Sequence, residues 1–316
     1  MKHLAGSFLI ATLCLTIAKG QSQPTPGAAL QRPATSLLGA PLFPPVLPKG
    51  QKEKLLQHYL AAKADYDTDP ANPDYIIWFG RRAAYLWRYR KAIEIFSKGI
   101  EAHPNDPRLY RHRGHRYVTV REFGKAIEDL RKAAELTSVR ADEIEPDGQP
   151  NAKNIPTGTL KSNIWYHLGL AYYLQGDFTR ALDAYRECMK YSTNDDMLCA
   201  TADWLSMTLR RLDRTEEAAD ILAKIHENMN IIENFSYHKR LLMYKGILPV
   251  DSLLNPGGMN DLDIATQGYG VANWYFYNGK NERARDLFRR ITEGSYWAAF
   301  GYIAAEAELA RTRRKQ

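Results

Sequence analysis

One short stretch constrains the fold of this chain more than any other part. Residues 162–190 read SNIWYHLGLAYYLQGDFTRALDAYRECMK, with a turn at Gly176 and Asp177. Before the turn, apolar residues recur at the spacing of one helix face, and a second apolar stripe follows it. Small residues stand where two helix backbones must approach closely. The pattern predicts a helical hairpin, which cannot bury its apolar stripes without neighbouring copies of itself.

Two earlier copies of the pattern are present in register. Gly80 and Gly114 correspond to Gly169 and are 34 residues apart. The first copy places Ile76, Phe79, Gly80, Tyr89, Ala92, Phe96, Gly99 and Pro104 at the signature positions, and the second places Tyr110, Arg113, Gly114, Phe123, Ala126, Leu130 and Ala133 there. Arg113 departs from the pattern at a position that is usually apolar. The agreement at the other positions predicts a repeat array.

The signature W-x2-L-G-x2-Y, followed by A-x3-F/Y with a 34-residue period, resembles that of the tetratricopeptide repeat family. The resemblance implies an all-α fold, a right-handed α-solenoid of helical hairpins with capping helices at both ends. We expect a capping helix over 51–72, repeats one and two over 73–137, an insertion loop over 138–161, repeat three over 162–195, a degenerate repeat four over 196–229, a half repeat or connector over 230–260, repeat five over 261–293, and a capping helix with a basic tail over 294–316.

The first 20 residues have the pattern of a signal peptide. A short basic start precedes an apolar core over 4–18, which is shorter than the roughly 20 residues that span a membrane. Small residues at Ala18 and Gly20 favour cleavage before Gln21. We therefore expect an exported protein, periplasmic or secreted, with no transmembrane span after signal removal. The alternative is an uncleaved signal that tethers the chain to a membrane. Residues 21–50 are rich in proline and predict a linker.

Two cysteines, Cys188 and Cys199, remain after the predicted cleavage site. An oxidising compartment allows a disulfide between them, which would fix the turn that separates two helices. The alternative is a pair of small buried thiols at packing positions. The sequence leaves both possibilities open.

The family resemblance also implies a ligand-binding groove, lined by the first helix of each repeat. The positions that face the groove in the family correspond here to Arg81, Tyr85, Arg108, Arg111, His115, Tyr166, Tyr173, Arg210, Arg211, Tyr269, Asn273 and Tyr277. Arginine offers planar, bidentate donors to carboxylates, and tyrosine offers a large contact area at low entropic cost. With 43 basic and 36 acidic residues the chain has a net charge of +7, which favours anionic partners. The alternative is that these side chains are simply solvated.

No catalytic residues, cofactor or metal site are predicted. His112, His115 and His167 could approach one another, but neither a cysteine nor a carboxylate joins them, and neighbouring arginines would repel a cation. The predicted function is a non-catalytic protein-interaction scaffold that binds an extended or acidic partner segment in its concave groove; a nucleic-acid partner is not expected. The alternatives are a binding module for an anionic envelope polymer and an accessory subunit of an envelope enzyme.

Overall fold

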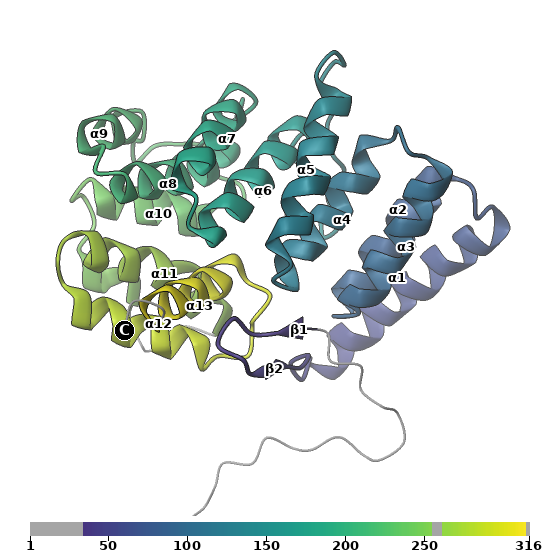
Figure 1. Ribbon diagram of the computed structural model, residues 1–316, viewed down its shortest axis with the longest axis horizontal. Helices are drawn as coiled ribbons and strands as arrows, with labels where there is room; N and C mark the ends of the chain where they lie inside the picture. The colour runs from purple at the N-terminus through teal and green to yellow at the C-terminus, as the bar shows by residue number, and fades with distance from the viewer. Residues whose placement is uncertain (1–33, 255–260, 314–316) are drawn as a thin grey trace, which may run out of the picture. The chain divides into compact units, whose positions relative to one another are not determined.

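The computed structural model describes residues 34–254 and 261–313, and helices account for most of this part of the chain (Figure 1). The helices are α1 (Lys49–Thr68), α2 (Pro73–Tyr85), α3 (Tyr89–Ala102), α4 (Pro107–Thr119), α5 (Phe123–Thr137), α6 (Leu160–Gln175), α7 (Phe178–Lys190), α8 (Asp195–Arg211), α9 (Thr215–Ala223), α10 (Phe235–Tyr244), α11 (Asp261–Tyr277), α12 (Asn281–Thr292) and α13 (Phe300–Arg313), with a 3-10 turn η1 (Val250–Leu254). Each hairpin packs on the next, as α3 does on α4 and α5 on α6. The predicted all-α array of helical hairpins is confirmed.

The first helices of the hairpins begin with side-chain caps that the sequence already contains. Asn72 accepts hydrogen bonds from two backbone N–H groups of α2, and Asp106 accepts one from α4. A proline follows each cap, at the position where a helix needs no N–H donor. Thr159 and Ser162 form a capping box at the start of α6. These caps place the starts of α2 and α4 one repeat apart.

The turns inside the hairpins share one backbone conformation. A residue just after the first helix has a positive φ in each of them: Trp87, Arg121, Gly176, Asp213 and Gly279. A left-handed residue at this place closes a helix within one short turn. Close packing follows, because a Cβ atom at Gly114 would lie 2.8 Å from Leu130, and one at Gly169 would lie 2.8 Å from Tyr185.

The C-terminal helix differs from the predicted capping helix. A cap buries one face, whereas residues 301–308 of α13 are all buried. Helix α13 packs on α11 and α12 and also on α6, and Figure 1 shows it beside α11 and α12. Its small residues allow this close approach, because a Cβ atom at Gly301 would overlap the backbone carbonyl of Ala265.

The predicted proline-rich linker is also corrected where the structure describes it. Strands β1 (Ala34–Thr35) and β2 (Pro41–Leu42) pair antiparallel, and Leu42 is buried. This hairpin is fixed to the C-terminal region, since Trp297 Nε1 donates a hydrogen bond of 2.6 Å to the carbonyl of Phe43. The predicted signal peptide lies outside the described residues. No helix in the described ranges is both long and apolar enough to cross a membrane.

The disulfide that the sequence left open is not formed. Both cysteines are free and buried. The thiol of Cys188 lies 3.3 Å from the carbonyl of Ser162 and 3.2 Å from the hydroxyl of Thr201, whereas that of Cys199 faces the sulfur of Met229 at 3.8 Å. Burial raises the pKa of each thiol to about 12. The two sulfurs therefore fill separate packing sites as thiols.

Candidate functional site

Five of the predicted groove residues lie in a buried polar network between α6, α8, α10, α11 and α13. The hydroxyl of Tyr173 accepts hydrogen bonds from Tyr269 at 2.8 Å and from Asn273 at 3.2 Å. Arg211 forms an ion pair with Glu308 of α13 at 2.8 Å. The Tyr166 hydroxyl lies 3.0 Å from that of Tyr237 on α10. These side chains hold the C-terminal helices in place.

Three more of the predicted residues contact the insertion, which covers 138–159 in the structure. Arg111 is buried and pairs with Glu145 at 2.8 Å. Arg81 donates a hydrogen bond of 2.8 Å to the carbonyl of Pro146. Tyr85 lies directly against Gly148, where a Cβ atom would overlap its hydroxyl. The insertion thus lies on the inner faces of α2 and α4.

The far end of the insertion is fixed to another part of the array. Thr157 and Asn151 both donate hydrogen bonds to the carboxylate of Glu233, which precedes α10. Ile144 and Thr159 form an antiparallel bridge that closes the insertion on itself. The insertion is therefore held at both ends by side-chain contacts.

The acidic groups that pair with this inner wall belong to the chain itself. Glu145 comes from the insertion, whereas Glu306 and Glu308 come from α13. Arg121, in the turn between α4 and α5, pairs with Glu306 at 2.9 Å, and both side chains are almost fully buried. Much of the basic surface predicted to attract a partner is therefore occupied by intramolecular partners.

One part of the wall stays open, and we call it the α2–α4 cleft. It consists of two adjoining cavities of about 330 and 630 Å³, which share Arg108 and Glu143. The smaller one is lined by Asp74, Ile77, Trp78, Arg81, Arg108, His112, Glu143, Ile144, Glu145, Pro146 and Leu160, and the larger one by residues 103–108, Arg140 and Glu143. The cleft thus combines the first helices of two repeats with the insertion.

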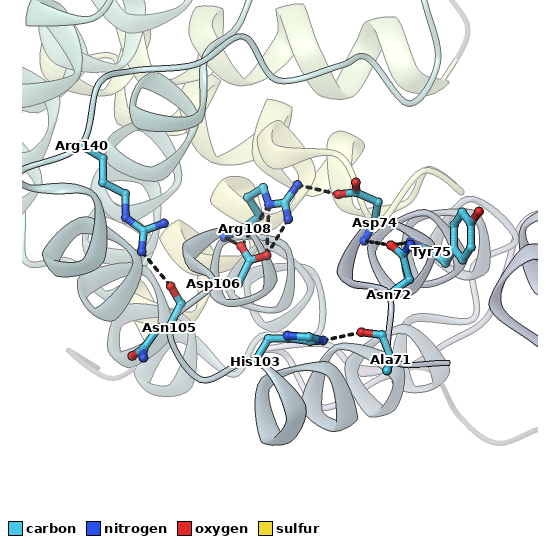
Figure 2. A network of polar contacts seen from close by, with 9 residues as sticks. All are labelled: Ala71, Asn72, Asp74, Tyr75, His103, Asn105, Asp106, Arg108 and Arg140. Atoms are coloured by element: carbon cyan, nitrogen blue, oxygen red, sulfur yellow. Dashed lines mark hydrogen bonds and ion pairs between the residues drawn. The ribbon is translucent and has the colours of Figure 1, made fainter. Parts of the chain in front are cut away.

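The three arginines of the cleft have different partners, and Figure 2 shows those of Arg108 and Arg140. Arg108 pairs with Asp74 and with Asp106, each at 2.6 Å, and these carboxylates raise its pKa. Arg140 donates instead to the backbone carbonyl of Asn105 at 3.1 Å (Figure 2). Arg81 donates to the backbone carbonyl of Pro146. Within the described residues, Arg81 and Arg140 form no ion pair. Their N–H groups can therefore donate to a carboxylate from outside.

Apolar surface lies next to these cations. The ring of Trp78 is half-buried, and the guanidinium groups of Arg81 and Arg82 lie 4.6 and 4.9 Å from its centroid. Ile144 of the insertion is 68% exposed. An aromatic ring, an exposed aliphatic side chain and two arginines are a combination that recurs where proteins bind peptides.

Arg210 and Tyr277 lie apart from the cleft. The Arg210 guanidinium is 4.6 Å from the centroid of the Tyr277 ring and donates to Thr215. The residues that sequence reasoning missed are Trp78, Arg140 and Ile144. Trp78 could have been recognised as a large aromatic beside two arginines, but the positions of Arg140 and Ile144 depend on how the insertion folds back.

The histidines lie together on the inner wall. The rings of His115 and His167 are 4.2 Å apart between centroids. Arg111 Nη1 lies 3.1 Å from Nδ1 of His112 and 3.5 Å from Nδ1 of His115. Arginine only donates, so both of these nitrogens accept, and their lone pairs are not available to a metal. Burial and the nearby arginines lower the pKa of all three imidazoles.

The tetratricopeptide repeat family model matches residues 162–195. No curated protein matches the sequence significantly.

Several solved structures are similar to this chain at low sequence identity. A tetratricopeptide repeat protein from Parabacteroides merdae ATCC 43184 is 13% identical, with 82% of this chain and 93% of that chain covered and a TM-score of 0.48. BtubC from P. vanneervenii is 14% identical, with 84% and 92% covered and a TM-score of 0.43. YrrB, described as a TPR protein with an unusual peptide-binding site, is 15% identical, with 81% and 98% covered and a TM-score of 0.42.

Proposed function

We propose that this chain, which is a tetratricopeptide repeat protein, is a non-catalytic scaffold that binds an extended segment of a partner protein in the α2–α4 cleft. The observation that supports this most directly is the cleft's composition. Trp78 comes from the first repeat, Arg108 from the second, and Arg140 and Ile144 from the insertion. Three separate segments contribute to one open surface, which is how binding sites are built on repeat arrays.

Beside Arg81 and Arg140, the chemistry of the cleft favours a segment with an apolar anchor and an acidic side chain, whereas the carboxylate of Glu143, which lines both cavities, would repel an acidic side chain placed next to it. Trp78 and Ile144 offer apolar surface to the anchor. Arg81 and Arg140 offer guanidinium donors whose hydrogen bonds, among the described residues, go to backbone carbonyls. A carboxylate would form charge-assisted hydrogen bonds with either of them, and such bonds are stronger than those to a neutral carbonyl. Arg108 already pairs with Asp74 and Asp106, so its main role would be to hold the start of α4 against the start of α2.

Site-specific photo-crosslinking tests this proposal. A photoreactive amino acid at Ile144 should crosslink one discrete partner in extracts of the source cell. The same amino acid at Glu128, an exposed position of α5 outside the cleft, should not. Arg140→Glu should reduce the crosslinked yield roughly tenfold or more, because a charged hydrogen bond contributes about 1.5–3 kcal/mol.

The matched control is Arg290→Glu, which reverses an exposed arginine of α12 and makes the same change in net charge. It should leave the yield unchanged. Equal crosslinking from positions 144 and 128, or equal loss with both charge reversals, would show that the cleft is not the binding surface. Loss of the partner at moderate salt without sequence selectivity would favour an anionic polymer instead.

A further inference from the structure

Helix α1 lies at the edge of the array and exposes apolar side chains there (Figure 1). Of its 20 residues only Ala62 is buried, and the helix packs on α2. Terminal elements of repeat arrays usually present a polar outer face. Helix α1 departs from this rule, because Leu56 and Leu60 are 38% and 54% exposed. An exposed apolar pair in a terminal helix points to a docking surface.

The two leucines belong to a stripe along α1 that has the spacing of a coiled-coil seam. Its six members are four, three, four, three and four residues apart, the alternation that keeps side chains facing a paired helix. All six side chains belong to exposed residues. We call this surface the α1 stripe, and its members are Lys49, Glu53, Leu56, Leu60, Lys63 and Asp67.

The order of residues along the α1 stripe is complementary to its own reverse. When a second α1 lies antiparallel, with Leu56 of one copy against Leu60 of the other, Glu53 faces Lys63 across the interface. The first and last members of the stripe, which are also oppositely charged, meet in the same way. Each layer then joins two leucines or two opposite charges, as a two-fold symmetric interface requires. A parallel pair in register would instead bring like charges together.

The charges of α1 also run against its helix macrodipole. Lys49 and Lys52 lie in the first turn, whereas Asp65 and Asp67 lie in the last turn. The macrodipole favours acidic side chains at the start of a helix and basic ones at its end, so this order is unfavourable in a single helix. An antiparallel partner places its acidic end beside the basic end of the first copy, which compensates both the charges and the dipoles.

We infer that two copies of this chain associate through antiparallel pairing of their α1 stripes, with the two-fold axis at the level of His58. Lys63 now pairs with Asp67 at 2.6 Å within the helix, but both side chains are about half exposed, so little is lost when Lys63 turns to Glu53 of the second copy. The inference does not depend on the function proposed for the α2–α4 cleft, because that cleft is lined by other segments.

Sedimentation equilibrium of the full chain over about 1–500 μM tests the inference. Because two leucines from each copy form a small apolar centre, we expect a dissociation constant on the order of 10–100 μM, with weaker association at high salt. Glu53→Lys brings lysines together in two layers of the dimer, and Lys63→Glu brings glutamates together there. Each variant should associate roughly tenfold more weakly than the parent. An equimolar mixture of the two should regain the parent's affinity, because the layers between different variants are complementary again.

The matched control is Lys54→Glu, which makes the same charge change as Lys63→Glu at an exposed position on the other side of α1. It should leave the affinity unchanged. A parent chain that is monomeric throughout, single variants that associate as well as the parent, or a mixture no tighter than its components would each overturn the inference. Circular dichroism checks the helical fold. Should a charge variant fail to fold, Leu60→Gln decides in its place, since roughly tenfold weaker association supports the pairing and unchanged association rejects it.

Discussion

At the scale of single residues, the inner wall shows how a repeat scaffold tolerates buried polar groups. Hydrogen bonds from Arg111 require His112 and His115 to be neutral, whereas burial and nearby arginines lower the pKa of His167. Arg111 donates to the first two, and His167 donates to a backbone carbonyl. Protonating His112 or His115 would remove the lone pair that Arg111 uses and place a second cation beside it. These contacts make the fold sensitive to acid.

Stability should therefore fall as the pH drops below about 6.5, the ordinary pKa of histidine. The folded-state pKa values are lowered, so the unfolded chain binds protons that the folded chain does not. The stabilisation is complete above pH 6.5, and each histidine removes up to about 1.4 kcal/mol per pH unit below it. Urea unfolding at pH 7.5, 6.5 and 5.5 measures this dependence.

Replacing His167 with asparagine should reduce the slope of unfolding free energy against pH by the contribution of one histidine, which is up to about 1.4 kcal/mol per pH unit. The control is His58→Asn on α1, which changes an exposed histidine outside the cluster and should preserve the parent's slope. A pH dependence that is unaltered by His167→Asn would contradict the role assigned to this residue.

At the scale of helices, glycines set how closely neighbouring helices approach. At Gly169 an added Cβ atom would meet the ring of Tyr185, a side chain in the buried core. At Gly301 it would overlap the carbonyl of Ala265, and that backbone is fixed within α11. The cost of the added methyl group therefore depends on whether its neighbour is a side chain or a backbone.

Gly301→Ala should destabilise the protein by about 3 kcal/mol or more, and Gly169→Ala by about 1–3 kcal/mol, the usual range for overpacking. Gly124→Ala on α5 is the control, because nothing lies within 4 Å of its added Cβ atom. We expect that change to be stabilising by about 0.5–1 kcal/mol. Free energies of unfolding from urea denaturation measure all three. A Gly301→Ala variant as stable as the parent would mean that α13 does not pack so closely on α11.

At the scale of the whole described molecule, residues 34–254 and 261–313, a buried polar junction joins segments that are far apart in the sequence. Arg121 Nε lies 2.9 Å from the carboxylate of Glu306, which is 185 residues further along the chain. Arg121 also donates to the carbonyl of Trp297, and Glu306 accepts from the backbone N–H of Leu37. The second hairpin, the C-terminal helix and the β-hairpin therefore share one polar junction.

Arg121→Met should cost about 3–5 kcal/mol, because Glu306 would stay buried without its partner. Arg121 has a positive φ, and methionine has the same backbone preferences as arginine, so the substitution adds no backbone strain. The double variant Arg121→Met with Glu306→Leu should recover much of the loss, since no unpaired charge remains. A double-mutant cycle measured by urea denaturation gives the coupling energy. Additive effects of the two substitutions would show that the junction contributes no coupling.

The helical hairpins could be predicted because their determinants are local. The 3.6-residue period, the caps at Asn72 and Asp106 and the small residues at Gly80 and Gly114 all act within one repeat. The candidate site could be predicted only in part. The arginines at positions 81 and 108 were identified from repeat register, but Trp78, Arg140 and Ile144 complete the cleft through the path of the insertion.

The sequence by itself determined the class of fold, the repeat boundaries around Gly169 and the basic character of the inner wall. Only the tertiary structure decided what covers that wall. Small and acidic residues occur on every side of helix α13, so its sequence pattern does not predict which face is buried. The helices that it packs on lie far away in the chain. A local pattern specifies which residues must be buried, but it does not specify which distant segment buries them. The pairing of Glu145, Glu306 and Glu308 with the basic wall therefore became visible only when the chain was folded.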